Sequence, residues 1–518
     1  MSTRYLYFTV FASGLTTLAI ELSAARLLGP YFGVSSLVWA SIIGLILIYL
    51  TVGYFLGGQW ADRSPYPETM YKILVWGAFT AGLIPFMGIF ILRPAAEAFD
   101  SFRLGSLFGA FAAVLILFIV PITLLGTISP FAIRLAMRDS RQAGTIAGRI
   151  YAISTLGSFV GTFLPDLVLI PLIGTRATFL SFSSLLVLVA LAGLWISGGF
   201  RKVLPYLWMP VVLAIFFWIN QTQPLKNTSG QIFETESTYN YIQVLEINDY
   251  RYLRLNEGQG IHSIYHPEQI EFSGTWDQFL AAPFFNLAPY QPESVKSIAI
   301  IGLAAGTTVR QANAVFGPIP IDGYEIDQKI IAVGQEYFGM NQPNLTAIPE
   351  DGRWGLAHSG KQYSLIGVDA YRPPYIPWHL TTREFFTLIR EHLTEDGTLA
   401  INVGRAPNDR RLIEALASTI RDVFPSVFVM DVPGSFNSII YASVQESSWS
   451  NLQDNYLLLR QQPGMPSLLL NSLQRALENQ QPTPARAQVF TDDRAPIEWL
   501  THALIVNFVV SGGTEDLQ

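Results

Sequence analysis

A glycine turn and an acidic pair stand about 20 residues apart in the second half of the chain, a spacing found in nucleoside-binding folds. Gly302 and Gly306 follow an apolar run, and Glu325 and Asp327 end the next one. Glycines between a strand and a helix let a ligand approach the backbone, and the helix N-terminus adds partial positive charge. An acidic residue ending the second strand can hydrogen-bond ribose hydroxyls. Together these features predict a nucleoside site, although a Gly-x-x-x-Gly turn alone also serves helix packing.

The elements that would carry these residues are short apolar runs separated by helical stretches. The runs cover 297–302, 321–325, 363–368 and 398–403, with two more near 427–432 and 438–443. This alternation is typical of a mostly parallel, doubly wound sheet. Asp369 directly follows the third run, at the carboxyl end of a strand, where ligands of such sheets bind.

An alternating segment precedes that sheet. Residues 231–247 and 251–263 alternate apolar and polar side chains around Asn248-Asp249, a good turn dipeptide, and predict a β-hairpin. Together with the apolar first part of the chain, this divides the sequence into three expected domains. They are a transmembrane helical domain over 1–222, a β-rich subdomain over 223–295 and a nucleoside-binding domain over 296–518.

The first part of the chain predicts a multi-pass membrane bundle. Half of all residues are hydrophobic and only 14% are charged, and the acidic residues are sparse before residue 220. Crossing the hydrocarbon core takes about 20 helical residues. Seven stretches reach or approach this length: 5–28, 36–58, 72–92, 104–126, 145–173, 175–197 and 203–219. The fifth contains prolines that can kink it and the seventh is short, so counts of six or eight spans stay open.

Charged residues in these spans predict the orientation and the interior of the bundle. Glu21, Arg26 and Asp166 would be costly against lipid, so each should face protein or water, either as a functional site or as a structural polar group. Basic loops after the second, fourth and sixth spans share one side, which the positive-inside rule makes cytoplasmic. Seven spans then place the C-terminal domain outside the cytoplasm. This conflicts with the cytoplasmic location expected for a protein that uses a nucleoside cosubstrate.

The composition also argues against several classes of function. The net charge is −7 and no cluster of Lys and Arg is present, which argues against a nucleic-acid partner. The chain has no cysteine, which removes thiolate catalysis and Cys-based metal sites. The six histidines show no metal-ligand spacing, so no metal is expected.

Several motifs in order resemble those of the spermidine synthase family of polyamine aminopropyltransferases, over roughly residues 231 to 445. The chain is similar over its whole length to members that fuse a transporter-like membrane bundle to such a domain. The motifs are Glu236-Ser237-Thr238-Tyr239-Asn240, Gly258-Gln259, Gly302 to Gly306 with Arg310, Glu325-Ile326-Asp327, and Val368-Asp369.

This resemblance implies a β subdomain followed by a Rossmann-like sheet of the S-adenosylmethionine-dependent methyltransferase type. In the family, decarboxylated S-adenosylmethionine donates its aminopropyl group to an amine such as putrescine, and dimers are common. By resemblance Asp369 is catalytic, and a carboxylate that accepts the proton of the attacking amine is chemically appropriate. The implied cosubstrate-binding residues are Tyr239, Gln259, Gly302, Gly306, Glu325, Asp327 and Asp351. The predicted substrate-binding residues are Trp276, Tyr371 and Arg372.

Departures from the family pattern leave the substrate open. The acidic position of the family's glycine loop is Ala305, and Arg372 stands where the family has a second Asp. An arginine repels a cationic diamine and instead suits a carboxylate, as in intact S-adenosylmethionine. The leading hypothesis is a membrane-anchored aminopropyltransferase. The alternatives are methyl transfer or lyase chemistry on intact S-adenosylmethionine, and a noncatalytic domain that senses a nucleoside or polyamine.

Overall fold

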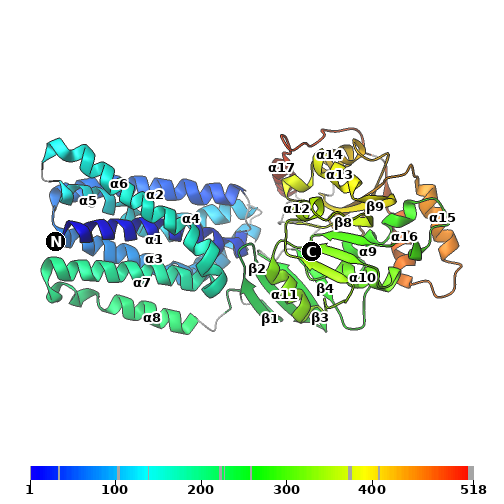
Figure 1. The fold of residues 1–518 in the computed structure, drawn as a ribbon. Coiled ribbons are helices and arrows are strands. Elements are labelled where there is room, and N and C mark those ends of the chain that lie inside the picture. The colour runs from blue at the N-terminus through cyan, green and yellow to red at the C-terminus, as the bar shows by residue number, and fades with distance from the viewer. Residues whose placement is uncertain are drawn as a thin grey trace. The chain divides into compact units, whose positions relative to one another are not determined.

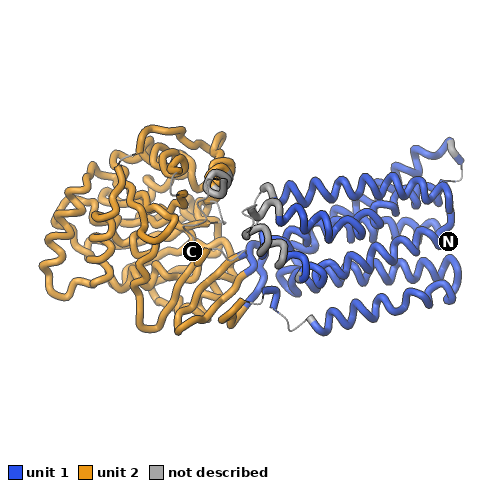
Figure 2. The backbone as a smooth tube through the Cα atoms, turned by 180° about the vertical axis from the view of Figure 1, so that it is seen from behind, with its two compact units in different colours: residues 1–227, 234–241, 256–258 blue, residues 228–233, 242–255, 259–518 orange. Residues whose placement is uncertain are grey.

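The computed structural model divides the chain into two compact units (Figure 2). Unit 1 comprises residues 1–227, 234–241 and 256–258, and unit 2 comprises 228–233, 242–255 and 259–518. The structure describes residues 2–510 apart from 33–35, 102–104, 138, 221–223, 227, 257–259, 372–375, 407–408 and 483. Two predicted site residues, Gln259 and Arg372, therefore lie outside the described residues.

Unit 1 consists mainly of long apolar helices (Figure 1). Within the described part of the chain, six helical segments are long and apolar enough to cross a membrane, as judged by length and composition. The helices are α1 (Thr3–Phe32), α2 (Ser36–Arg63), α3 (Pro67–Ser101), α4 (Gly105–Gly126), α5 (Ile128–Ala136), α6 (Ala143–Leu164), α7 (Ile170–Gly198) and α8 (Trp208–Asn220).

One of these six segments, Ala143–Gly198, is 56 residues long. It contains α6, a π-helical turn η2 (Pro165–Leu169) and α7, and its backbone leaves helical geometry at Gly174, where φ is 80° and ψ is 166°. Figure 1 shows α6 and α7 as two rods that run in opposite directions. The predicted fifth and sixth spans, 145–173 and 175–197, meet at this glycine.

Polar residues line the protein interior at the break. The guanidinium Nε of Arg26 lies 3.0 Å from the Asp166 carboxylate, so these two charged side chains of the apolar helices are paired. The backbone N–H of Thr175, the first residue after the break, donates to the Glu236 carboxylate at 2.7 Å. Because the first N–H groups of a helix have no partner within it, Glu236 caps this part of α7.

A four-stranded antiparallel sheet begins the C-terminal part of the fold. Its strands β1 (Gln231–Glu236), β2 (Tyr241–Ile247), β3 (Tyr250–Leu255) and β4 (Ile261–Tyr265) pair in chain order. Asn248 and Asp249 form the predicted tight turn between β2 and β3, with φ values of 52° and 66°. Each of the two alternating segments thus contains two strands rather than one.

The second sheet has eight strands in the order β12-β10-β11-β9-β8-β5-β6-β7. The five strands from β9 to β7 pair in parallel, whereas β11 is antiparallel to β9 and to β10. The strands are β5 (Ile298–Ile301), β6 (Ile321–Tyr324), β7 (Leu345–Ile348), β8 (Tyr363–Val368), β9 (Leu393–Gly404), β10 (Ser426–Asp431), β11 (Asn437–Ser443) and β12 (Gln480–Gln481).

Helices cover both faces of this sheet (Figure 1). One apolar layer packs α9 (Thr275–Phe279), α10 (Thr307–Phe316), α15 (Trp449–Leu459) and α16 (Ser467–Glu478) against it. The opposite layer contains α12 (Gly352–Ala357), α13 (Arg383–Glu391), α14 (Arg411–Arg421) and α17 (Ile497–Val510). A third apolar cluster packs α11 (Gln328–Tyr337) against β2 and β3.

The predicted fold class, a bundle of apolar helices followed by a β subdomain and a Rossmann-like sheet, is confirmed. The chain runs from β5 to β6 and β7 on one side, then returns to β8 on the other side of β5. The carboxyl ends of β5 and β8 therefore flank the point where the strand order reverses, which is where ligands of open α/β sheets bind.

Candidate active site

The glycine turn connects β5 to α10 and requires left-handed backbone. Gly302 and Gly306 have φ values of 88° and 81°, a region that residues with a Cβ rarely adopt. A Cβ on Gly302 would lie 2.6 Å from the backbone of Asp369. The turn is therefore packed directly against the residue that follows β8, and the two predicted parts of the site are adjacent.

Glu325 holds the glycine turn from the end of β6. Its carboxylate accepts hydrogen bonds from the backbone N–H of Ala304 at 3.0 Å and of Asp327 at 3.1 Å. Burial is the main influence on this group and raises its pKa to about 7. Each carboxylate oxygen retains a second lone pair, which a hydroxyl of a bound ribose could use.

Asp327 has a structural role in the described chain. It is the N-cap of α11 and accepts a hydrogen bond from the backbone N–H of Lys329 at 3.1 Å. Its side chain is almost fully buried. The sequence predicted ligand binding from the position of Asp327 at a strand end. Helix capping explains an acid at this position equally well.

Asp369 lies at the carboxyl end of β8 and is held by two donors. The Nδ2 of Asn402, on the neighbouring strand β9, donates to its carboxylate at 2.8 Å, and the indole of Trp276 on α9 donates as well. Burial outweighs both hydrogen bonds and raises the pKa of Asp369 to about 7. A carboxylate with this pKa can accept or release a proton near neutral pH.

Tyr371 lies beside Asp369. The corner of the site is formed by Gly302, Trp276, Asp369 and Tyr371. Its hydroxyl accepts a hydrogen bond from the backbone N–H of Gly404 and lies 3.4 Å from the carbonyl oxygen of Asn402. Burial, together with the charge of Asp369, raises the pKa of this phenol. Tyr371 therefore stays neutral and connects the segment after β8 to the end of β9.

A buried network fixes the short helix that carries Trp276. The next residue, Asp277, is fully buried and accepts hydrogen bonds from Gln311 on α10 and from the backbone N–H of Ser273. Arg475 on α16 forms an ion pair with it at 3.2 Å. A fully paired carboxylate of this kind makes the position of α9, and hence of Trp276, well defined.

Asp351 follows β7 and caps α12. Its carboxylate accepts hydrogen bonds from the backbone N–H groups of Arg353 and Trp354, and it lies 2.8 Å from Nε2 of His379. The His379 hydrogen bond is the main reason that the pKa of Asp351 is lowered. Asp351 is thus an ionised group held in place at the edge of the sheet.

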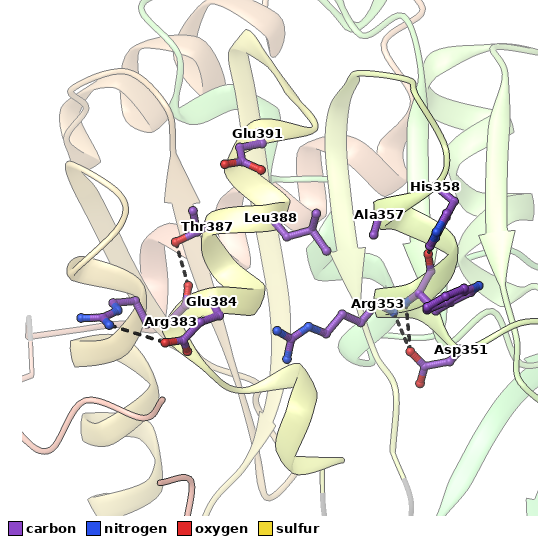
Figure 3. A pocket seen from close by; sticks show the side chains of 10 residues that line it. Asp351, Arg353, Ala357, His358, Arg383, Glu384, Thr387, Leu388 and Glu391 are labelled. Atoms are coloured by element: carbon purple, nitrogen blue, oxygen red, sulfur yellow. Dashed lines mark hydrogen bonds and ion pairs between the residues drawn. The ribbon is translucent and has the colours of Figure 1, made fainter. Parts of the chain in front are cut away.

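A surface pocket between α12 and α13 has Asp351 on its rim (Figure 3). Trp354 and His358 line one side of it, and Arg383 and Glu384 line the other. The pocket shares Asp351 with the predicted site, but Asp369 and Glu325 are not among the described residues that line it. We therefore base the candidate site on the strand ends rather than on this pocket.

The remaining predicted residue, Tyr239, belongs to unit 1. It is 45% exposed, and its backbone N–H donates to Ser237 Oγ at 3.0 Å. Within the described residues of unit 2, the structure thus brings together Gly302, Trp276, Asp369 and Tyr371 at one corner and joins Glu325 to the same glycine turn.

Three contributors were missed by the sequence analysis. Ser263 on β4 accepts a hydrogen bond from the backbone N–H of Ala305, His379 binds Asp351, and Asn402 binds Asp369. Asn402 had a detectable signal, because it is a polar residue inside the apolar run of the strand next to β8. The other two gain their roles only through tertiary contacts.

A comparison with protein families matches part of the C-terminal unit, and several known proteins are similar to this chain. A family model described as the spermine/spermidine synthase domain matches residues 286–454. A probable polyamine aminopropyl transferase of Bifidobacterium longum is 32% identical over 288 residues, which cover 52% of this chain and 63% of that protein. A polyamine aminopropyltransferase of Vibrio vulnificus is 25% identical over 247 residues, covering 46% of this chain and 80% of the relative.

Two solved structures are also similar to this chain. The spermidine synthase from Thermotoga maritima has 19% sequence identity and a TM-score of 0.38, covering 47% of this chain and 84% of that one. A probable spermidine synthase from Corynebacterium glutamicum has 18% identity and a TM-score of 0.39, covering 52% and 99%. The chain spans less than two thirds of the length of its Bifidobacterium relative. Residues 286–454 are thus similar to a spermine/spermidine synthase domain, and in this chain they follow an N-terminal region of apolar helices.

Proposed function

We propose that the protein is a membrane-anchored transferase of the aminopropyltransferase type. It transfers an aminopropyl group from decarboxylated S-adenosylmethionine to an amine such as putrescine. The observation that carries this proposal is Asp369, a partly buried carboxylate with a pKa of about 7 at the end of β8, directly beside the glycine turn.

In the proposed reaction, the neutral amine attacks the carbon bonded to the sulfonium. A C–N bond forms while the C–S bond breaks, and sulfur leaves as a neutral thioether. The amine nitrogen becomes more acidic as it bonds to carbon, and Asp369 accepts its proton. Burial favours this role because a carboxylate with a raised pKa is a stronger base than an exposed one.

Other residues of the corner support the binding of the cosubstrate. Glu325 has free lone pairs for ribose hydroxyls, and Gly302 allows the turn to approach Asp369 without a side chain between them. Asp351 is the proposed partner of the adenine, with its orientation fixed by α12 and His379. Tyr239 and Gln259 remain proposed ligand contacts by resemblance to the family. Arg372, which stands where the family has an acid, remains a proposed contact for a carboxylate.

A second candidate is methyl transfer or lyase chemistry on intact S-adenosylmethionine, and the presence of Arg372 in the sequence favours it. The other departure, Ala305, gives less support. Its side chain is 1% exposed and packs with Ile330 and Val333 in the apolar cluster under β2 and β3. An acidic side chain on this backbone would face that cluster rather than a ligand.

The test is calorimetric titration of the detergent-purified full chain with S-adenosylmethionine, its decarboxylated form and methylthioadenosine. Mass analysis of incubations with and without putrescine then identifies any product. We expect preferential binding of the decarboxylated form and an aminopropylated amine. A methylated or eliminated product would support the second candidate, and binding without turnover would leave only a sensing role.

Replacing Asp369 with asparagine separates catalysis from binding. Asp369→Asn keeps a hydrogen-bond acceptor for Asn402 but removes the base, so turnover should fall by about 10²–10⁴-fold. The dissociation constant for methylthioadenosine should change by less than about threefold, since this ligand does not need the base. Unchanged turnover would contradict the role given to Asp369.

A further inference from the structure

Positive charge gathers at one end of the apolar helices, called here the basic end. It comprises the start of α1 and the links from α2 to α3, from α5 to α6 and from α7 to α8 (Figure 1). Within residues 2–5, 59–72, 134–149 and 198–208, the described part of the chain contains eight Arg and Lys residues and three acidic ones. A protein surface with such an excess of positive charge attracts anions.

Ion pairs use only three of these eight cations. Each acidic residue of the basic end pairs with one cation: Asp62 with Arg134 at 3.1 Å, Glu68 with Lys202 at 2.9 Å, and Asp139 with Arg141 at 3.2 Å. The other five side chains form no ion pair or hydrogen bond with any residue that the structure describes: Arg4, Arg63, Lys72, Arg149 and Arg201. These five cations are therefore available to an anion from outside the chain.

Two of the five lie on neighbouring elements of the bundle, α3 and the segment between α7 and α8. This segment contains two short helical turns, η3 (Phe200–Lys202) and η4 (Leu204–Tyr206). Arg201 lies on η3, which the ion pair from Lys202 to Glu68 joins to the first turn of α3. Lys72 follows Glu68 by four residues, so it lies on the same face of α3, about 6 Å further along the helix.

Exposed indole rings lie next to these two cations. Trp76 follows Lys72 by one further turn of α3 and is 43% exposed, and Trp208 begins α8 and is 45% exposed. The two indole rings have centroids 6.1 Å apart, and both contact the ring of Phe79. We call Lys72, Trp76, Arg201 and Trp208 the α3–α8 patch.

The surroundings of the α3–α8 patch are apolar. Three further side chains of the segment before α8 are large, apolar and exposed: Phe200, Leu204 and Leu207. Cations one helical turn away from indole rings, with aliphatic side chains beside them, are typical of a membrane interface. There the indoles lie at the level of the headgroups, and Lys and Arg extend toward the phosphates.

We propose that the α3–α8 patch binds one anionic phospholipid. Lys72 and Arg201 contact its headgroup, and Trp76 and Trp208 contact the upper part of its acyl chains. The charge of the patch complements an anion, and the exposed apolar side chains beside it complement a lipid, because a soluble anion would leave them in water. The inference rests on the membrane-anchored part of the proposed function and adds a lipid site to it.

The experiment measures lipid binding to the delipidated full chain in neutral detergent by native mass spectrometry. The probes are dioleoylphosphatidylglycerol, the neutral lipid dioleoylphosphatidylcholine, and glycerol 3-phosphate as a soluble anion. The wild-type chain should bind phosphatidylglycerol at least about tenfold more tightly than either of the other two. Equal binding of the two lipids, or equally tight binding of glycerol 3-phosphate, would overturn the inference.

A pair of double variants separates the patch from the total charge of the basic end. Lys72→Gln/Arg201→Gln should weaken phosphatidylglycerol binding at least about tenfold and leave phosphatidylcholine binding unchanged. Arg63→Gln/Arg149→Gln is the matched control, because it removes two exposed, unpaired cations of the same end from α2 and α6. It should change the affinity by less than about threefold. Equal losses in the two variants would show a response to total charge and would contradict a site at the patch.

Tryptophan fluorescence tests the patch without removing a charge, so the test does not depend on the folding of the charge variants. Phosphatidylglycerol and phosphatidylcholine with brominated acyl chains are added in turn to the wild-type chain and to Trp76→Phe/Trp208→Phe. The quenching that this substitution removes should be at least about twofold larger with phosphatidylglycerol. The same loss of quenching with both lipids would speak against the patch.

Flotation with liposomes of pure phosphatidylcholine tests the membrane anchoring separately. A chain that floats but does not prefer phosphatidylglycerol would leave the membrane-anchored function standing and overturn only the lipid site. A chain that does not float would overturn the anchoring and, with it, this inference.

Discussion

The carboxylate of Asp369 lies in an environment that disfavours its ionised form. Burial raises its pKa to about 7 although Asn402 and Trp276 both donate to it. In its proposed role as general base, Asp369 must be ionised before the amine attacks, so the protonated fraction would limit the rate at acidic pH.

We expect kcat/KM to rise about tenfold per pH unit below pH 7 and to level off above it. A pH–rate profile measured with saturating cosubstrate checks this, with a correction for the protonation of the free amine. Mutation of Tyr371 to Phe should leave the apparent pKa within about half a unit, because its phenol stays neutral over this range. A profile that stays flat down to pH 5 would exclude Asp369 as the base.

The same pKa predicts a pH-dependent stability difference. The ordinary pKa of this group is 3.8 and the folded value is about 7, so the native state binds more protons between these values. The free energy of unfolding therefore falls as pH rises from about 4 to 7, and the cost is fully present above that range.

Asp369→Asn removes this cost, so the variant should melt at a higher temperature than the wild-type chain at pH 8. The gain should shrink as pH falls from 7 toward 4 and vanish below both pKa values, where Asp369 is protonated in the folded and the unfolded state. Thermal unfolding at several pH values measures it. A variant that is less stable at pH 8 would show that the carboxylate contributes more through its hydrogen bonds than burial costs.

At the scale of single residues, sequence identified the acids at strand ends but not all of their partners. The alternation of apolar runs with helices is local, so the positions of Glu325 and Asp369 could be predicted from it. An acid at a strand end can bind a ligand or cap the following helix, as Asp327 does. Which of the two it does depends on where that helix begins. Asn402 became part of the site because β9 pairs with β8, a contact between distant segments.

At the scale of elements, the turn from β5 to α10 depends on glycine for two separate reasons. Gly302 has a left-handed φ, and a Cβ there would also meet the backbone of Asp369. Gly317, at the end of α10, has a φ of 79° but no atom within 4 Å of the Cβ position. Substitution of either glycine by alanine therefore places a Cβ on a backbone with positive φ. Only at Gly302 would that Cβ also clash with a neighbouring backbone.

Gly317→Ala should cost about 1–2 kcal/mol of unfolding free energy, the penalty for a left-handed residue with a Cβ. Gly302→Ala should cost at least about 1 kcal/mol more and should weaken methylthioadenosine binding, since the strand end that carries Asp369 must move. Urea unfolding and calorimetry measure both effects. Equal losses in the two variants would mean that the neighbouring backbone accommodates the methyl group.

The connection between α7 and β1 gives a second prediction at this scale. The Glu236 carboxylate caps α7 through Thr175, and burial raises its pKa. Glu236→Leu leaves the Thr175 N–H without this acceptor and should lower the thermal stability in detergent by the equivalent of about 1–3 kcal/mol. Glu246→Leu, at a half-exposed carboxylate on β2, is the control and should change stability by less than about 0.5 kcal/mol.

At the scale of the whole molecule, hydropathy identified the apolar helices and periodicity identified the sheet. Sequence did not show β7 or β12 or the division of the β segment into four strands, because these short elements are stabilised by pairing with distant strands. It also could not fix the number of membrane crossings. The fifth predicted span ran through Pro165 and Pro171, and only the backbone geometry locates the break at Gly174.

The absence of cysteine from the sequence makes the number of crossings testable. Single cysteines in place of Ser2, before α1, and Ser467, at the start of α16, can be labelled with a membrane-impermeant maleimide in intact and in lysed cells. Seven crossings predict that only one of the two positions reacts in intact cells. Reaction of both or of neither in intact cells, with full labelling after lysis, would contradict an odd number.

The break at Gly174 has a consequence for the metabolites that the protein can meet. A continuous helix from Ala143 to Gly198 would be about 84 Å long, nearly three times the thickness of the hydrocarbon core. If this region crosses a membrane, reversal at Gly174 would resolve the mismatch by dividing one overlong helix into two crossings. The parity of the crossings, and with it the compartment that would supply substrates to the spermidine synthase-like domain, would then depend on the torsion angles of one glycine.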